Sequence, residues 1–461
     1  MTIDRRKFLT SVAGACGAVA AGSMAGLHPS KLFAGAGSQQ QSELASPELL
    51  SRAQSSIEHI VVVTMENRSF DHFFGWMSWA NGKQAGLQYK DPGGAFHPTH
   101  RLAPDFTGCP HPDPDHSYNG ARVEYDHGLM DGFLLDTAND VFSIGYYTAA
   151  DIPFYATLAK NYTTLSRYFP SILGPTFPNR LFQHAAQTDR LDDSVSLTSL
   201  PTIWDRLAAA GVSHKYYYNN VPFLALWGLK YIFISHSYSN FLSDAANGTL
   251  PAVSFVDPIY TVLDDGTGND DHPHADIRYG DYFLSQTFRA VANGPAWKNT
   301  VFIVNFDEWG GFFEHIAPPR AAAPNSVDPD LINGKGLLGF RVPTVVASPF
   351  TAGSPSSPRV VNTTFDHTSI LKLIEWRWGL PPLTARDAST DVGNIVTALN
   401  LTNPRTSVPV LPNPGKPQTS PCFGFHNEEG PSAQHEEGPS AQRVTPMGYL
   451  AQSDLMQGWK R

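Results

Sequence analysis

The 461-residue sequence has few cysteines, few charged residues and a minority of basic ones. Its three cysteines form no Cys-x-x-Cys pair and no two histidines stand four residues apart, so the common zinc patterns are missing. The net charge of −10 argues against nucleic-acid binding, which needs clustered Lys and Arg. With 41% hydrophobic and 16% charged residues, the composition predicts a globular protein rather than a disordered one.

The N-terminus lacks an apolar run long enough to be a good membrane span. Two arginines in Asp4–Leu9 precede an Ala/Gly-rich stretch, which is typical of a twin-arginine signal peptide. A small-residue cleavage site follows at Ala34–Ala36. We therefore predict a signal peptide over 1–36, a flexible leader over 37–54, the twin-arginine translocase as a partner during export, and a periplasmic or secreted protein.

Cys109 and Cys422 remain in the predicted mature chain. Two thiols in an oxidising compartment can pair, but two unrelated cysteines are equally compatible with the sequence, because it does not show their separation in space.

Short apolar runs rich in β-branched residues read as central strands at Ile57–Met65, Thr300–Phe306 and Val342–Ser348. Amphipathic segments between them predict helices at Pro201–Gly211, Tyr279–Asn293 and Thr368–Trp378. This alternation predicts an α/β sandwich, with helices on both faces of a mostly parallel sheet.

Three further regions are defined by composition. Residues 81–150 and 212–275 are rich in Asp, His, Pro and Gly, and we expect long insertions over the carboxyl edge of the sheet. Residues 403–461 are Pro-rich and repeat the heptapeptide Glu-Glu-Gly-Pro-Ser-Ala-Gln, which predicts a flexible low-complexity tail. The catalytic domain is then expected over 55–402.

Two predicted strands end in oxygen-bearing side chains. Glu66 and Asn67 follow the first strand, and Asp307 and Glu308 follow the second. Carboxylates and an amide at neighbouring strand ends can together bind a hard divalent cation. Alternatively, Asn67 caps the next helix and one of the adjacent carboxylates is a solvated surface charge.

Thr176 lies in Gly174–Arg180, where two prolines and a glycine predict a stiff loop around a single hydroxyl. A threonine attacks an ester only when a base or a metal activates it, and the predicted metal ligands could do so. An ordinary turn stabilised by its hydroxyl is the alternative. His116 and His272, each in a predicted insertion, are candidates to contact a phosphate or protonate a leaving alkoxide.

Together these motifs resemble the bacterial phosphoesterase family that contains phosphatidylcholine-type phospholipases C and certain acid phosphatases. The resemblance covers roughly residues 57–401. Its motifs run in the family's order: His59–Gly75, Asp115–His116, Gly128–Phe133, Gly174–Arg180, Asp271–Pro273, Asp307–His315, Arg341–Pro343 and Asp366–Ser369.

The resemblance implies an alkaline-phosphatase-like fold. It implies one divalent metal ion (Ca, Mg, Mn, Zn or Fe) held by Glu66, Asn67, Asp307 and Glu308. Thr176 is the implied nucleophile, with His116 and His272 also catalytic. Asn67, Asn179 and Arg180 are expected to bind substrate. Trp309 and Glu314 depart from the family's usual residues and leave the role of His315 open.

The implied function is metal-dependent phosphoester hydrolysis, first of all by a phospholipase C acting on phospholipid at a membrane surface. An acid phosphatase for monoesters and an inactive phosphate-binding surface protein are the alternatives. Residues 176–180 also match the Cys/Ser-x-Pro-x-Arg spacing of sulfatases, but threonine cannot be oxidised to formylglycine, so that class is excluded.

Overall fold

The computed structural model describes residues 52, 55–263, 265–422 and 444–459, all within one compact unit. The predicted signal peptide (1–36) and, apart from Arg52, the predicted leader (37–54) lie outside the described residues. In the described part of the chain, no helix has the length and apolar character that crossing a bilayer requires.

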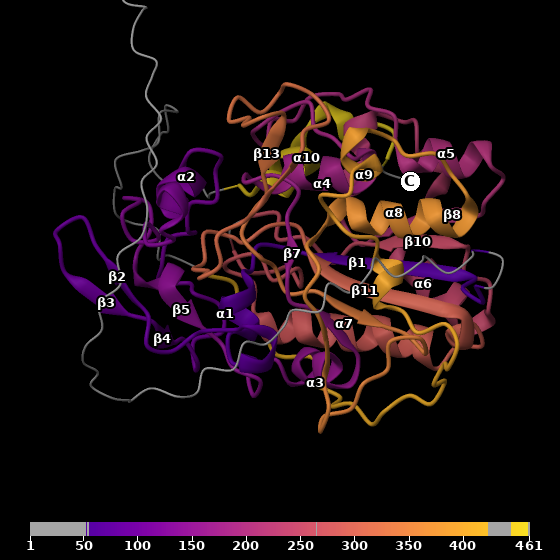
Figure 1. The fold of residues 1–461 in the computed structure, drawn as a ribbon, viewed down its shortest axis with the longest axis horizontal. Coiled ribbons are helices and arrows are strands. Elements are labelled where there is room, and N and C mark those ends of the chain that lie inside the picture. Colours follow the sequence, from indigo (N-terminus) through magenta and orange to yellow (C-terminus); the bar gives the residue numbers. More distant parts are fainter. Residues whose placement is uncertain (1–51, 53–54, 264, 423–443, 460–461) are drawn as a thin grey trace, which may run out of the picture. The chain divides into compact units, whose positions relative to one another are not determined.

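An eight-stranded sheet forms the centre of the unit, in the order β15-β6-β14-β11-β1-β10-β8-β9 (Figure 1). The strands are β15 (Arg359–Val361), β6 (Thr163–Leu165), β14 (Val345–Ala347), β11 (Thr300–Phe306), β1 (His59–Met65), β10 (Val253–Val256), β8 (His214–Tyr218) and β9 (Ser235–Ser237). Strand β14 runs antiparallel to both neighbours, and every other neighbouring pair is parallel. The predicted mostly parallel sheet is confirmed, although the run at 342–348 is its antiparallel member.

Helices cover both faces of this sheet, as predicted (Figure 1). One layer contains α4 (Thr176–Ala185), α5 (Ile203–Ala209) and α8 (His367–Trp378), and the other contains α3 (Pro153–Asn161), α6 (Tyr238–Asn247) and α7 (Ile277–Ala292). Their apolar sides pack on β1 and β11, whose residues are almost all fully buried. The sandwich is therefore held by apolar burial on both sides of its two central strands.

Smaller elements surround the sandwich. They are α1 (Phe70–Phe74), α2 (Gly120–Tyr125), α9 (Ala385–Ala388), and four two-stranded sheets, β2 (Gln88–Lys90) with β3 (Phe96–Pro98), β4 (His100–Arg101) with β5 (Gly145–Tyr146), β7 (Tyr168–Phe169) with β16 (Phe365–Asp366), and β12 (Arg320–Ala322) with β13 (Lys335–Leu337).

The predicted insertion at 212–275 is wrong in part. This region supplies β8, β9 and β10 to the central sheet, together with α6. These strands are three to five residues long. β8 reads His-Lys-Tyr-Tyr-Tyr and β9 Ser-His-Ser, without an apolar run, and the apolar β10, Val-Ser-Phe-Val, has only four residues. By contrast, 81–150 contains α2 and the short strands β2 to β5, with none of the central sheet, as expected of an insertion.

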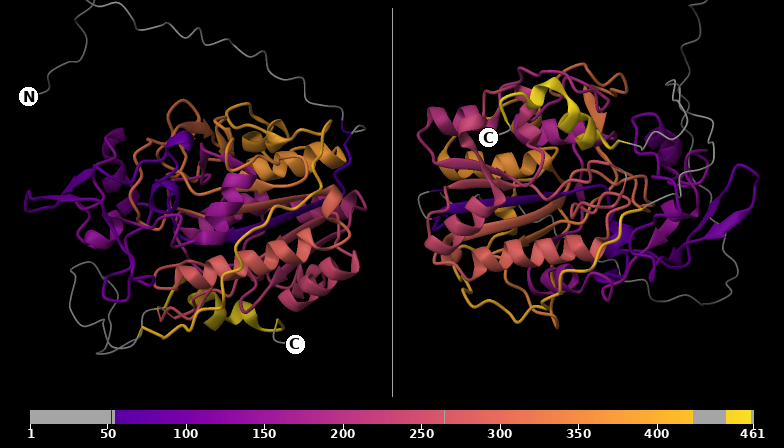
Figure 2. Two further views of the ribbon diagram at one scale, coloured as in Figure 1. Left: turned by 90° about the horizontal axis from the view of Figure 1, so that it is seen from below. Right: turned by 180° about the vertical axis from the view of Figure 1, so that it is seen from behind.

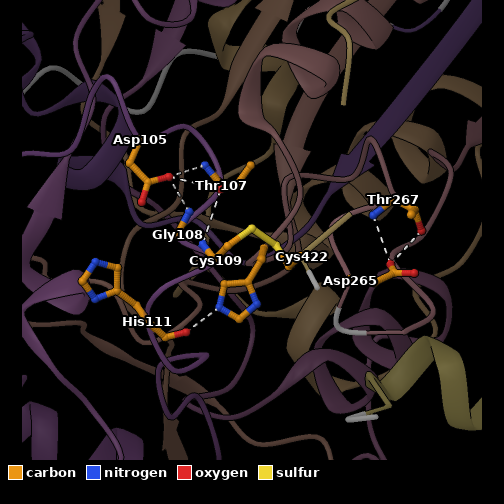
Figure 3. Close-up of a disulfide and its surroundings, with 9 residues drawn as sticks. Asp105, Thr107, Gly108, Cys109, His111, Asp265, Thr267 and Cys422 are labelled. Atoms are coloured by element: carbon orange, nitrogen blue, oxygen red, sulfur yellow. Dashed lines mark hydrogen bonds between the residues drawn. A yellow bond between two sulfur atoms is a disulfide. The ribbon is translucent and has the colours of Figure 1, made fainter. Parts of the chain in front are cut away.

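The C-terminal region differs from the flexible tail that its composition predicts. Residues 444–459 contain α10 (Pro446–Gln452), whose Met447 and Leu450 are fully buried, and α10 lies on the same side of the sheet as α8 (Figure 2). Cys422 forms a disulfide with Cys109, with their Cα atoms 5.4 Å apart (Figure 3). The repeated heptapeptides lie outside the described residues.

Candidate active site

The two acidic motifs emerge side by side because β1 and β11 are adjacent and parallel. Met65, the last residue of β1, is in register with Phe306, the last residue of β11. The next residues, Glu66 and Asp307, therefore leave the sheet at the same edge. The expectation that these strands are neighbours is confirmed. The four predicted metal ligands are all buried.

Backbone geometry holds these motifs against each other. Asn67 has a φ of +59°, and its backbone N–H donates to Asp307 Oδ1 at 3.2 Å. The Glu308 N–H donates to the same oxygen at 2.8 Å. Gly310 has a φ of +66°, and a Cβ there would lie 2.2 Å from the Asn67 carbonyl oxygen. Only glycine permits this close approach.

Arg180 is the cation of the carboxylate cluster. Its guanidinium pairs with Glu66 at 3.1 Å, with Asp307 at 3.2 Å and with Asp257 at 3.4 Å, and all four side chains are buried. The Arg180 guanidinium carbon, Cζ, also lies 4.9 Å from the centroid of the Tyr260 ring. These contacts fix the guanidinium among the carboxylates, and the substrate contact that the sequence predicts for Arg180 stays a prediction. Sequence reasoning also missed Asp257.

Thr176 is the first residue of α4, not part of a loop that continues to Arg180. Its Oγ1 is buried and has no hydrogen-bond partner. Thr176 stands one helical turn before Arg180, so the two side chains share a face, and Arg180 contacts Glu66 and Asp307. The face of α4 that carries Thr176 is therefore turned toward the acidic cluster, and Thr176 stays the predicted nucleophile.

Asn179 holds the segment in front of Thr176. Its amide donates to the carbonyl oxygens of Gly174 at 2.7 Å and Pro175 at 3.1 Å, and its Oδ1 accepts from the Ile172 N–H at 3.1 Å. These bonds position the segment that carries Thr176, and the contact of Asn179 with substrate stays a prediction.

Two buried oxygens of the acidic motifs, Asn67 Oδ1 and Glu308 Oε1, also lack a hydrogen-bond partner. Leaving such atoms unpaired costs free energy unless another group binds them. Burial raises the pKa of Glu66 and of Glu308 well above the ordinary value; Arg180 opposes this at Glu66, while Asp307 adds to it at Glu308. A divalent cation would satisfy these oxygens and favour the ionised carboxylates, so the residues present fit an all-oxygen metal site.

The two predicted catalytic histidines come together beside this cluster. The His116 and His272 ring centroids are 5.9 Å apart, and the ligand atoms of Asp113, His116 and His272 all lie within 4.8 Å of one another. His116 Nδ1 bonds the Pro114 carbonyl oxygen at 2.8 Å, and His116 Nε2 is 3.3 Å from Asn67 Nδ2. That contact turns the other end of the Asn67 amide, Oδ1, away from His116 and leaves it available as a ligand.

Three further residues lie at the site, and the sequence analysis assigned none of them a role. Asp193 Oδ1 accepts from the N–H of Phe177 at 2.7 Å, and burial raises the pKa of Asp193 to about 6. His367 Nε2 donates to the Asp307 carbonyl oxygen at 2.7 Å, and burial lowers the pKa of His367 to about 4. Asp113, near both catalytic histidines, is the third. His367 lies within the motif Asp366–Ser369, whereas the only signal for Asp113 and Asp193 is a neighbouring motif or acid.

His315, whose role the sequence left open, belongs to a separate buried network. Its backbone N–H donates to Asp71 Oδ2 at 3.0 Å. Arg341 pairs with Glu314 at 2.7 Å and with Asp71 at 3.4 Å. The Arg341 guanidinium neutralises the two carboxylates, so this network ties α1 to the segment after β11.

A cavity of about 590 Å³ opens beside the N-terminus of α4. Its lining includes Pro175, His116 and the acidic residues Asp113, Asp115, Asp192 and Asp193, and the described lining residues include no Lys or Arg. Another part of the wall comes from Val444, Thr445 and Pro446. A negatively charged cavity of this size next to the buried hydroxyl favours a substrate group that carries positive charge.

A phosphoesterase family model matches residues 57–381, and the chain belongs to that family. It is therefore a hydrolase acting on phosphate esters. Non-specific phospholipase C6 of Arabidopsis thaliana is 32% identical over 77% of this chain and 75% of its own length. Phospholipase C B of Mycobacterium tuberculosis is 34% identical over 79% of this chain and 80% of its own. A solved alkaline phosphatase superfamily protein from Vibrio parahaemolyticus aligns with 75% of this chain and 74% of its own at 12% identity and a TM-score of 0.37.

Proposed function

We propose that this protein is a metal-dependent phospholipase C that cleaves phosphatidylcholine-type diesters to diacylglycerol and phosphocholine. The observation that carries the proposal is the buried, unpartnered hydroxyl of Thr176. It lies on the helix face whose Arg180 pairs with Glu66 and Asp307, and the preceding residue, Pro175, lines an acidic cavity. A zwitterionic diester suits that cavity better than a dianionic monoester, because its headgroup is cationic. The phospholipase C names of the relatives support the same substrate class.

Glu66, Asn67, Asp307 and Glu308 would hold one divalent cation. When bound, it would lower the pKa of the Thr176 hydroxyl and offset phosphate charge. The unpartnered oxygens of Asn67 and Glu308 are the donors whose environment supports this assignment.

Thr176 Oγ1 attacks phosphorus in line with the departing diacylglycerol oxygen, and its proton leaves to solvent. The new bond is an Oγ1–P ester, and the P–O bond to diacylglycerol breaks. His272 or His116 donates a proton to the departing alkoxide. The N-terminal end of α4, where Thr176 stands, also directs the positive end of its helix dipole toward the phosphoryl group, which favours negative charge there. Water then hydrolyses the phosphothreonine and releases phosphocholine.

The test compares wild type with Thr176→Ala and Thr176→Ser on the p-nitrophenyl ester of phosphocholine and on phosphatidylcholine vesicles. We expect Thr176→Ala to lose at least about a thousandfold in kcat, because no covalent route remains, while Thr176→Ser retains measurable turnover. Elemental analysis should find the same metal content in wild type and Thr176→Ala. Near-normal activity in Thr176→Ala refutes the nucleophile, and faster hydrolysis of p-nitrophenyl phosphate by wild type favours an acid phosphatase instead.

Export by the twin-arginine pathway to the periplasm or the exterior remains part of the proposal. The Cys109–Cys422 disulfide supports it, because such bonds persist in oxidising compartments. Cell fractionation with and without Arg5→Lys and Arg6→Lys tests it: the variant should stay in the cytoplasm, and export of the variant at the wild-type level would contradict the pathway.

A further inference from the structure

The C-terminal segment that lines the cavity lies beyond the family match. The family model ends at residue 381, whereas Val444, Thr445 and Pro446 form one side of the cavity beside the predicted nucleophile. This wall is therefore a feature of the present chain that the family assignment does not explain.

Thr445 fixes the segment in place. It is the N-cap of α10, where its Oγ1 accepts the Gly448 N–H at 3.1 Å and donates to the Thr261 carbonyl oxygen. Val444 forms an antiparallel bridge with Leu263. A Cβ on Gly448 would lie 1.9 Å from the Val262 carbonyl oxygen, so the helix is pressed against that strand-like stretch. The segment is consequently a packed wall.

The walls of the cavity differ in chemistry. The insertion and the segment after α4 contribute four aspartates, Asp113, Asp115, Asp192 and Asp193. The C-terminal wall contributes the apolar side chains of Val444 and Pro446, both partly exposed. A headgroup with a cationic centre and an apolar surface would fit both walls. Its positive charge would face the aspartates, and its carbon atoms would pack against Val444 and Pro446.

We propose that Val444 and Pro446 form the apolar side of the headgroup site and so determine which headgroups the enzyme accepts. This rests on the proposed phosphodiesterase function. Thr445 positions the wall by anchoring it to Thr261 and has no contact role of its own.

Val444→Trp tests the proposal, because an indole at this position fills part of the cavity and aromatic residues are tolerated in bridged strands. The substrates are the p-nitrophenyl esters of phosphocholine and of methyl phosphate, which share a leaving group and differ in headgroup. We expect the phosphocholine-to-methyl ratio of kcat/KM to fall at least tenfold, mainly through KM for phosphocholine. Tyr449→Ala is the matched control, since Tyr449 is exposed on the same helix and outside the cavity lining.

An unchanged ratio in Val444→Trp, or an equal loss on both esters, overturns the proposal, since equal loss indicates a structural effect. A second measurement separates this from failure of the proposed function. Phosphocholine and inorganic phosphate are titrated calorimetrically into Thr176→Ala with and without Val444→Trp. We expect Val444→Trp to weaken the binding of phosphocholine at least tenfold more than the binding of phosphate. Equal phosphocholine affinities with and without Val444→Trp would overturn the proposed role of Val444. If wild type hydrolyses neither ester yet Val444→Trp still weakens phosphocholine binding, the proposed function is wrong and the proposed headgroup contact is retained.

Discussion

Replacing Arg180 with Met removes the cation from the centre of three buried carboxylates. Arg180 pairs with Glu66, Asp257 and Asp307 at 3.1 to 3.4 Å, and its own side chain is 1% exposed. Methionine keeps the length and the packing of the stem but leaves the carboxylates without their partner. Breaking a buried ion pair in this way costs about 3–5 kcal/mol, because the remaining charge is desolvated and unpaired.

That loss translates into a modest shift in melting temperature. Unfolding of about 400 ordered residues at about 2.1 cal/mol/K each gives an unfolding entropy of about 0.8 kcal/mol/K. A loss of about 3–5 kcal/mol then lowers Tm by about 4–6 °C near neutral pH.

The loss should depend on pH. Burial raises the pKa of Glu66, Asp257 and Asp307, and Arg180 opposes that rise. Without Arg180 these folded-state pKa values rise further, so the folded variant holds protons that the unfolded chain releases above about pH 4. Stability of the variant therefore falls as pH rises from that value, and the gap to wild type is larger at pH 7.5 than at pH 5.

Differential scanning calorimetry at both pH values checks this, with EDTA present so that no divalent cation replaces the guanidinium. Arg206→Met is the control. It makes the same substitution on α5, but the hydrogen bond from the Arg206 guanidinium to the Pro382 carbonyl oxygen, at 3.5 Å, is exposed and involves no carboxylate. An unchanged Tm in Arg180→Met, or an equal drop at pH 5 and pH 7.5, would refute the assignment of Arg180 as the neutralising cation.

Two further changes test the surroundings of the site. Gly310→Ala should lower kcat/KM at least tenfold, because its Cβ would meet the Asn67 carbonyl oxygen at 2.2 Å; Gly334→Ala, at a φ of +73° with open space around it, controls for backbone strain, and equal activities would contradict the crowding argument. Reduction of the Cys109–Cys422 disulfide should lower the stability of wild type by about 2–5 kcal/mol, seen as a reductant-dependent Tm, whereas a Cys109→Ser, Cys422→Ser variant should melt at one temperature with or without reductant. A wild-type Tm that is the same with and without reductant would show that the disulfide does not constrain the unfolded chain.

The sequence alone predicts the centre of the fold and the main acidic motifs. Strands β1 and β11 are apolar runs that end in Glu66-Asn67 and Asp307-Glu308, and both the strands and their adjacency are confirmed. Three amphipathic segments become α5, α7 and α8. These features are visible because each depends on a local pattern, an apolar run or a helical period, that survives in one dimension.

Short strands and the start of α4 were not predicted correctly, because their local sequence patterns are short or ambiguous. Strands β8 and β9 lack an apolar run, and that of β10 has only four residues. The Gly174–Arg180 segment reads as a proline-stiffened loop although Thr176 begins α4. Proline is compatible with the first turn of a helix, so its presence does not distinguish the two structures.

Contacts between distant parts of the chain could not be predicted from the sequence, because they form only in the folded protein. The pairing of Cys109 with Cys422 spans 313 residues, and the cavity wall at Val444 meets residues more than 250 positions earlier. Arg180 becomes the partner of Glu66 and Asp307 only when α4 packs against the edge of the sheet. Residue types determine which interactions are available, but burial and distance determine which of them form, and both arise only when the chain is folded.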